Sequence, residues 1–273
     1  MSHELDRRVE DGTSYLTGGE GPTVVFLHGI PGSALTWEPV ATRLRDRYRV
    51  VLPDLRGFGH SEPPLEDYYM DGQARAVEGL LDALGVEEFS LVTHDFGGPV
   101  GLTMMRRAPG PDVRRLVLSD TNVFTDTHVP PPLRLAKVPL LGTLLFTATV
   151  GNRFGLRLLH RAAVRRRETA TWRSFQRHLT PSGMAMTRRV FQRSLADLEA
   201  NYREIERSLP DVGVPTLVLW GDSDPFFSTE VAERTRAAIP DAELVVYDRT
   251  GHFVPEERPA EVAADVGRFL GDG

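Results

Sequence analysis

Short apolar runs alternate along the chain with segments that carry a helical pattern, and this alternation restricts the fold more than any other feature. The runs lie at residues 23–27, 49–52, 89–92, 113–118, 216–220 and 243–247, and helical patterns at 37–46, 71–84, 99–107, 228–239 and 259–270. Continuously apolar runs predict strands that are buried on both faces. Because strands alternate with helices, the sequence predicts an α/β fold with a mostly parallel central sheet flanked by helices.

One long interval, residues 123–207, breaks this alternation because it contains several helical patterns and no convincing strand. We interpret it as an inserted helical cap, with residues 1–122 and 208–273 forming the α/β core. Residues 124–205 hold 14 Arg and Lys against 5 Asp and Glu, although the whole chain has a net charge of -6. This excess is typical of complementary packing and solvated helix faces; attraction of an anionic substrate is the alternative.

Composition excludes several kinds of chemistry and partner. The chain has no cysteine, so disulfides, thiolate metal sites and cysteine nucleophiles are absent. The negative net charge argues against nucleic-acid binding. No stretch reaches the ~20 apolar residues of a membrane span, and the N-terminus has no apolar signal segment. We therefore expect a cytoplasmic monomer or homodimer that acts on a small molecule without a cofactor or metal, and that has no nucleic-acid or membrane partner.

The segment Thr93-His94-Asp95-Phe96-Gly97-Gly98 lies between the apolar run at 89–92 and a helical pattern. A strand, a sharp turn and a helix in this order are typical of a nucleophile elbow, which lifts its central residue above the edge of the sheet. Glycines after the turn allow the helix to approach closely. The pattern nominates Asp95 as a nucleophile; the alternative is that Asp95 caps the helix that begins near Gly97.

This His-Asp-Phe-Gly-Gly turn resembles the aspartate form of the elbow in epoxide hydrolases and haloalkane dehalogenases of the α/β-hydrolase superfamily. The resemblance covers residues 20–122 and 208–270. The sequence His-Gly-Ile-Pro-Gly-Ser at 28–33 is similar to the superfamily's oxyanion loop. The resemblance implies an oxyanion hole formed by the backbone N–H groups of Ile30 and Phe96.

Two further segments resemble the loops that carry the acid and the base in this superfamily. The Gly-Asp-Ser-Asp turn after the run at 216–220 implies that Asp224 is the acid, with Asp222 and Asp120 as alternatives. The Gly-His-Phe segment after the last run implies that His252 is the base. The order of nucleophile, acid and base along the chain agrees with that of other α/β-hydrolases.

A carboxylate nucleophile suits attack on a saturated carbon, because aspartate with its ordinary pKa of about 3.9 is already ionised near pH 7. Attack produces an alkyl-enzyme ester on Asp95. His252, oriented by Asp224, would then activate water to hydrolyse this ester. An epoxide substrate also needs a proton donor for its ring oxygen, whereas a haloalkane needs N–H donors for the departing halide.

The leaving group decides between these two reactions. The resemblance implies Trp after the nucleophile and Asn after His-Gly as the usual halide donors, but Phe96 and Ile30 occupy these positions. Epoxide hydrolases usually use two cap tyrosines, and the predicted cap contains only Tyr202. The candidates for substrate or leaving-group contacts are Tyr202, Trp172, His178 and Trp37, with His160 as another possible partner of the tyrosine.

The sequence therefore predicts a hydrolase with an Asp95 nucleophile, in the first place an epoxide hydrolase that acts on a small hydrophobic epoxide. A haloalkane dehalogenase is the alternative with the same mechanism. A protein of this fold that binds a small molecule with little turnover is an alternative of another class. A serine esterase is disfavoured, because no serine occupies the elbow and Ser90 lies within the predicted strand.

Overall fold

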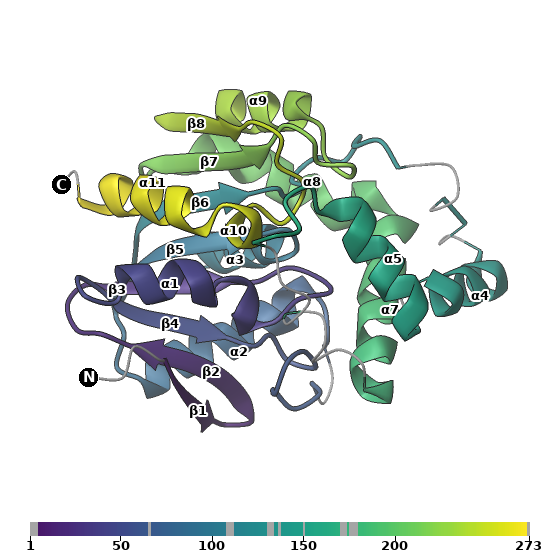
Figure 1. Cartoon of the computed structure of the whole chain (residues 1–273), viewed down its shortest axis with the longest axis horizontal. Coiled ribbons are helices and arrows are strands. Elements are labelled where there is room, and N and C mark those ends of the chain that lie inside the picture. The colour runs from purple at the N-terminus through teal and green to yellow at the C-terminus, as the bar shows by residue number, and fades with distance from the viewer. Residues whose placement is uncertain are drawn as a thin grey trace.

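The computed structural model describes residues 5–64, 67–107, 112–129, 134–135, 138–149, 151–169, 174 and 180–271. These residues form an eight-stranded sheet with the order β1-β2-β4-β3-β5-β6-β7-β8 (Figure 1). Its strands are β1 (Asp6–Glu10), β2 (Thr13–Gly18), β3 (Thr23–Leu27), β4 (Arg49–Pro53), β5 (Glu88–His94), β6 (Asp112–Ser119), β7 (Thr216–Gly221) and β8 (Ala242–Tyr247). Strands β3 to β8 are parallel, which confirms the predicted fold class.

All six predicted apolar runs lie in the parallel part of the sheet. The sequence did not predict the antiparallel hairpin of β1 and β2 at one edge. Strand β1 is largely exposed and rich in charged residues, so it lacks the apolar run by which a buried strand is recognised. Charged residues are typical of an edge strand, which has unpaired backbone groups on one side.

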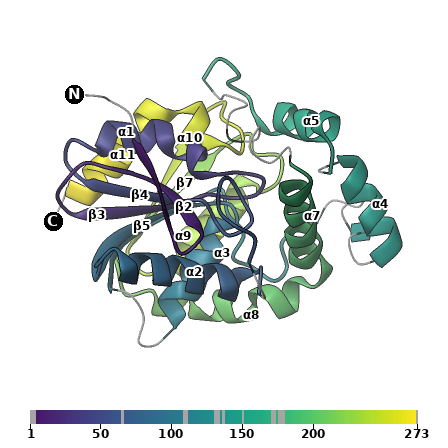
Figure 2. The same cartoon turned by 90° about the horizontal axis from the view of Figure 1, so that it is seen from below.

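Helices cover both faces of the sheet (Figure 2). One face packs against α1 (Glu38–Leu44) and α11 (Pro259–Gly271), and the other against α2 (Met70–Ala83), α3 (Gly97–Arg106) and α9 (Thr229–Ala238). Successive strand residues point to opposite faces, so Phe26 is buried among residues of α1 and α11, and Leu27 among residues of α2 and α3. Shorter helices are η1 (Ala34–Thr36), η3 (Leu209–Asp211) and α10 (Val254–Glu257).

Helices α4 (Pro139–Thr149), α5 (Arg153–Ala163), α7 (Pro181–Ala196) and α8 (Leu198–Ser208) lie between β6 and β7, and we call them the helical insertion. Both views place α4, α5 and α7 beyond one end of the sheet, while α8 lies next to α3. The division into a core of 1–122 and 208–273 and a cap of 123–207 stays a prediction. Within the described residues, no helix combines the length and the apolar character that crossing a bilayer requires.

Candidate active site

Asp95 lies at the sharp turn between β5 and α3. Its backbone has a φ of 49°, in the left-handed region that non-glycine residues rarely adopt. Its N–H donates to the carbonyl of Ser119 at 3.0 Å, and the Thr121 hydroxyl donates to its carbonyl at 2.6 Å. A side chain at Gly97 would collide with the Leu27 carbonyl, so the close approach of helix and strand requires glycine there. These backbone contacts stabilise the strained turn.

The Asp95 side chain does not cap the following helix. Phe96 is the residue that precedes the first turn of α3, and no side chain caps that helix. Instead, Asp95 Oδ1 accepts a hydrogen bond from the backbone N–H of Ile30 at 2.7 Å. The alternative of a helix-capping aspartate is therefore wrong.

Ile30 and Phe96, the two residues predicted to form an oxyanion hole, are both near Asp95: Ile30 donates its N–H to the Asp95 carboxylate, and Phe96 follows Asp95 in the chain. A side chain at Gly29 would overlap this carboxylate, so glycine allows the Ile30 loop to approach it. Phe96 stands at the start of α3, where backbone N–H groups have no partner within the helix. Its ring packs against Tyr69, with 5.5 Å between the ring centroids.

His252 connects two carboxylates. Its Nδ1 donates to Asp224 Oδ2 at 2.9 Å, and its Nε2 lies 3.7 Å from Asp95 Oδ2, which is an ion-pair distance. The other Asp224 oxygen accepts the N–H groups of Phe226 at 2.7 Å and Phe227 at 3.2 Å, so it is fixed in orientation. The structure brings together Asp95, His252 and Asp224, which were predicted from separate loops.

Asp222, the alternative acid, takes a different position. It is exposed, and its Oδ1 accepts hydrogen bonds from the Thr250 N–H at 3.2 Å and the Ser223 hydroxyl at 2.9 Å. These contacts brace the loop that leads to His252. The geometry therefore pairs the imidazole with Asp224 and leaves Asp222 as a turn residue.

Opposite charges control the ionisation of the Asp95–His252 pair. Burial alone would lower the pKa of His252, but the charges and hydrogen bonds of Asp224 and Asp95 outweigh it and raise this pKa well above its ordinary value. Burial would likewise raise the pKa of Asp95, but the hydrogen bond and charge of His252 lower it below the ordinary carboxyl value. The two opposite shifts favour a carboxylate that faces an imidazolium.

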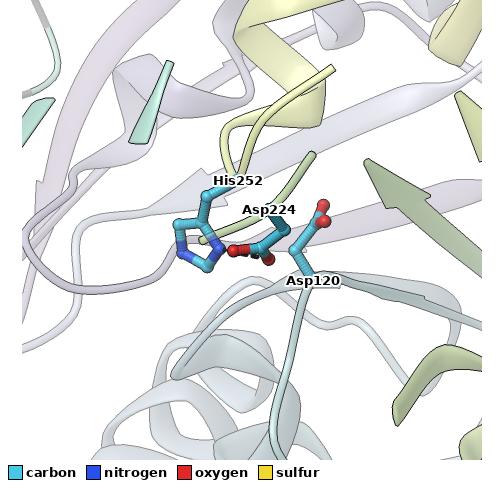
Figure 3. A group of neighbouring side chains, drawn as sticks. All are labelled: Asp120, Asp224 and His252. Carbon is cyan, nitrogen blue, oxygen red and sulfur yellow. Dashed lines mark hydrogen bonds and ion pairs between the residues drawn. The ribbon is translucent and has the colours of Figure 1, made fainter. Parts of the chain in front are cut away.

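Asp120, at the end of β6, lies on the side of Asp224 that faces away from the imidazole (Figure 3). Its oxygens accept hydrogen bonds from the Gly221 N–H at 3.0 Å and the Ser119 hydroxyl at 2.8 Å. Burial and the nearby Asp224 carboxylate raise the pKa of Asp120 well above the ordinary value.

Asp120, Asp224 and His252 are residue types that bind metals, and their ligand atoms lie within 4.8 Å of one another. However, the facing atoms of Asp224 and His252 are hydrogen-bonded to each other, as the dashed line in Figure 3 indicates. A metal ion would have to replace that bond. The three side chains therefore fit an arrangement in which Asp224 orients His252 better than they fit a metal site.

Two further histidines, His94 and His28, form structural hydrogen bonds close to Asp95 and His252. His94 Nε2 donates to the main-chain carbonyl of His252 at 2.9 Å, and burial lowers the pKa of His94 to about 3. His28 Nδ1 donates to the Gly29 carbonyl at 2.8 Å, and its Nε2 accepts the Leu55 N–H at 3.0 Å. The contact of His94 was not predicted, although its position directly before the nucleophile could have suggested it.

A predominantly apolar cavity opens above Asp95 and His252. The core contributes Phe96, Phe226, Phe227 and Phe253, and the insertion contributes Phe146, Thr149, Leu159, Phe191, Ser194, Leu195, Leu198 and Tyr202. Cavities of this kind bind apolar molecules and orient them through a few polar groups.

Tyr202 is the predicted cap residue that the structure places in this cavity. The Tyr202 hydroxyl interacts with the side chains of Ser194 and Asn122, and the negative charge of Asp95 contributes to raising the pKa of Tyr202. Tyr69, which the sequence analysis missed, donates from its hydroxyl to Ser194 Oγ at 3.1 Å. Burial raises the pKa of Tyr69 to about 12 and that of Tyr202 well above 10, so both phenols keep their protons at neutral pH.

The remaining predicted contact residues lie elsewhere. Trp37 is buried and donates its indole N–H to the Leu27 carbonyl at 3.0 Å. His160 is buried against Phe253, with 6.2 Å between ring centroids. Neither side chain belongs to the described residues that line the cavity. Trp172 and His178 lie outside the described residues.

Comparisons with known proteins agree with this architecture. A family model described as "alpha/beta hydrolase fold" matches residues 22–259. A cis-3-alkyl-4-alkyloxetan-2-one decarboxylase from Shewanella oneidensis is 29% identical (94% of this chain, 84% of that protein). Haloalkane dehalogenase 2 from Mycobacterium tuberculosis is 28% identical (92% and 89%), and epoxide hydrolase 4 from Homo sapiens is 27% identical (94% and 75%).

Solved structures share the fold. The haloalkane dehalogenase DbeA from Bradyrhizobium elkani superposes with a TM-score of 0.83 at 21% identity, covering 98% of each chain. At this identity the likeness concerns the fold alone.

Proposed function

This chain belongs to the alpha/beta hydrolase fold family and is a hydrolase, and we propose that it opens small hydrophobic epoxides with Asp95 as the nucleophile. One observation carries the proposal: the Asp95 carboxylate lies between the Ile30 N–H and the His252 imidazole, in a cavity that also contains the protonated Tyr202 phenol. We further propose that residues 123–207 act as a cap that closes this cavity.

In the first step, an oxygen of Asp95 attacks an epoxide carbon. A carbon–oxygen bond forms to the carboxylate while the ring carbon–oxygen bond breaks, and the ring oxygen takes the proton of the Tyr202 hydroxyl. The product is a hydroxyalkyl ester on Asp95. Proton donation of this kind typically accelerates a reaction by ~10²–10⁴-fold.

Ester formation prepares the second step. The ester carries no charge, so His252 loses one of the two carboxylates that raise its pKa. Its proton passes to the Tyr202 phenolate left by the first step, which restores the phenol and makes the imidazole a general base. The neutral imidazole, oriented by Asp224, takes a proton from water, whose oxygen attacks the carboxyl carbon of Asp95. Backbone N–H groups of Ile30 and Phe96 stabilise the tetrahedral oxyanion. As the bond between the carboxyl carbon and the alkoxy oxygen breaks, the leaving oxygen takes the proton from His252 and is released as a diol; the Asp95 carboxyl group then returns a proton to His252, which restores the carboxylate and the imidazolium.

The donors around the cavity support an epoxide over a haloalkane. The chain contains three tryptophans, and two of them donate their indole N–H to backbone carbonyls: Trp37 to Leu27 and Trp220 to Phe227. The Asn122 amide donates to the Phe124 carbonyl at 3.0 Å. The Tyr202 phenol, in contrast, lies in the cavity with its proton. The named relatives span dehalogenase, epoxide hydrolase and decarboxylase, so they do not choose between these reactions.

Trapping the ester tests the proposal. The variant His252→Gln is incubated with styrene oxide, 1-bromohexane or a β-lactone, and its peptides are analysed by mass spectrometry. We expect styrene oxide to add its full mass to the peptide that contains Asp95. The variant Asp95→Asn, which keeps the shape of the side chain, is the control and should stay unmodified.

Other outcomes contradict the proposal in distinct ways. Styrene oxide mass on another residue would exclude Asp95 as the nucleophile. Labelling by the bromoalkane alone would indicate that the substrate is a haloalkane and not an epoxide. Labelling by the lactone alone would indicate that the substrate is a strained ester. If the wild-type protein also keeps the adduct without releasing diol, it binds its ligand covalently and does not turn it over.

A further inference from the structure

Large apolar side chains are exposed on one part of the molecule. Among the described residues, nine large hydrophobic side chains are exposed, and seven of them lie between Leu135 and Leu158. These seven are Leu135, Val138, Leu140, Leu141, Leu144, Phe154 and Leu158. An apolar cluster of this kind on a surface marks a contact with another molecule or a membrane.

Helix α5 carries a stripe of arginines beside its exposed apolar residues. Arg153, Arg157 and Arg161 are spaced by four residues and are all exposed. At 3.6 residues per turn this stripe adjoins the one formed by Phe154 and Leu158. None of these three guanidinium groups forms an ion pair with any carboxylate in the described part of the chain.

Helix α4, which packs against α5, also carries exposed apolar side chains. Leu140, Leu141 and Leu144 are exposed, whereas Phe146 is buried and lines the cavity. Figures 1 and 2 both show α4 and α5 next to each other at the end of the molecule farthest from the sheet. We call the seven exposed apolar residues and the three arginines the docking face.

We propose that the docking face binds the surface of an anionic lipid membrane. Apolar side chains would enter the boundary between head groups and acyl chains, and arginines would bind lipid phosphates, as in helices that lie in the plane of a membrane. The distribution of charge supports this orientation: residues 124–205 hold 14 basic and 5 acidic residues, while the chain as a whole is negative. The insertion is attracted to an anionic surface that repels the core.

A second copy of the chain fits the docking face less well. A symmetric dimer through this face would use the same surface on both partners. The three arginines of each copy, which have no carboxylate partner among the described residues, would then lie close to those of the other copy, which is repulsive. The sequence predicted no membrane partner because it lacks a spanning segment, but binding at the surface requires none.

Vesicle flotation tests the proposal independently of the reaction. Wild-type protein is mixed with vesicles of phosphatidylcholine, with or without phosphatidylglycerol, at low and high salt. We expect strong binding only when phosphatidylglycerol is present, and weaker binding at high salt. The variant R153Q/R157Q/R161Q should bind roughly 100-fold more weakly, from about fivefold per arginine near an anionic surface. The variant L140S/L144S/F154S/L158S should lose binding.

Matched variants control for charge and apolar content. R43Q/R236Q/R249Q removes three exposed arginines outside the insertion, and V9S/V246S removes the two exposed hydrophobic residues of the core. Both should bind vesicles like the wild type, and thermal unfolding checks that every variant is folded. Absence of wild-type binding, or an equal loss in the control variants, overturns the proposal. So does a dimer in analytical ultracentrifugation that the apolar variant abolishes.

Discussion

The carboxyl edge of the sheet and the helical insertion contribute to the cavity in different ways. At the sheet edge, hydrogen bonds from the backbone hold each carboxylate: the Ile30 N–H donates to Asp95, and the N–H groups of Phe226 and Phe227 donate to Asp224. The insertion lines the cavity mainly with apolar side chains, and its helices contribute the polar side chains of Thr149, Ser194 and Tyr202. The sheet edge therefore fixes the positions of the Asp95 and Asp224 carboxylates, while the insertion determines the size and shape of the cavity.

The largest effect at the sheet edge is expected when its two candidate acids, Asp224 and Asp222, are each replaced by asparagine and compared. We expect Asp224→Asn to reduce kcat by about 10⁴-fold, because an amide cannot hold the imidazole in the required tautomer. Asp222→Asn, two residues away and exposed, should change kcat by less than about threefold, as for a surface substitution. Steady-state diol release measures both variants. An equal loss in Asp222→Asn would remove the distinction between the two aspartates.

Glu256 is a buried carboxyl group outside the sheet edge, and it tests whether hydrogen bonds compensate for burial there as they do at Asp95 and Asp224. Glu256 is buried, and burial raises its pKa to about 8. Between its ordinary pKa and pH 8, the unfolded chain is ionised while the folded chain keeps the proton, so stability decreases as pH rises. Glu256→Gln avoids this loss and should raise the free energy of unfolding by about 3 kcal/mol at pH 7.

Urea unfolding at several pH values checks this expectation. The difference between Glu256→Gln and wild type should disappear near pH 4, where both states of the wild type are protonated. Glu261→Gln is the control, because Glu261 is exposed and paired with Arg258. A stability gain for Glu256→Gln that does not depend on pH would contradict the proposed ionisation.

Tyr202 tests whether the insertion takes part in the chemistry. Tyr202→Phe should reduce epoxide opening by about 10²-fold, since it removes the proton donor and preserves the ring. Alkylation of Asp95 by a bromoalkane needs no proton and should hardly change. Tyr68→Phe is the matched control, because that ring lies against Arg189, with 4.0 Å between the guanidinium carbon and the ring centroid. If both reactions decline equally in Tyr202→Phe, this residue shapes the cavity without donating a proton.

The smallest expected effect concerns the attachment of the insertion to the core. Glu257 Oε2 accepts the backbone N–H groups of Arg165 and Arg166, both at 2.8 Å. Glu257→Gln weakens these charge-assisted bonds and should cost about 1 kcal/mol of stability. Amide hydrogen exchange should become faster at these two arginines. Glu168→Gln, an exposed substitution in the same segment, should leave their exchange unchanged.

The sequence predicted the sheet edge well because each candidate residue there follows a recognisable strand. The turn around Asp95 and the loops of Asp224 and His252 are local patterns, and a parallel sheet brings their positions to one edge. The meeting of these three side chains was therefore predictable. Their catalytic roles stay predictions that the experiments above address.

Contacts between distant segments could not be predicted in this way. The hydrogen bond between Tyr69 and Ser194 joins the core to the insertion across 125 positions of the sequence. The burial of Trp37, whose indole N–H donates to the Leu27 carbonyl, depends on the packing of α1. Both result from tertiary packing, which leaves no local pattern in the sequence.

One hydrogen bond connects the turn that carries Asp95 with the loop that carries His252. His94 directly precedes the nucleophile in the chain, and its ring donates to the main-chain carbonyl of His252. This hydrogen bond ties the position of the His252 backbone to the turn that carries Asp95. If Asp95 and His252 react as proposed, the turn that presents the nucleophile also anchors the loop that presents the base.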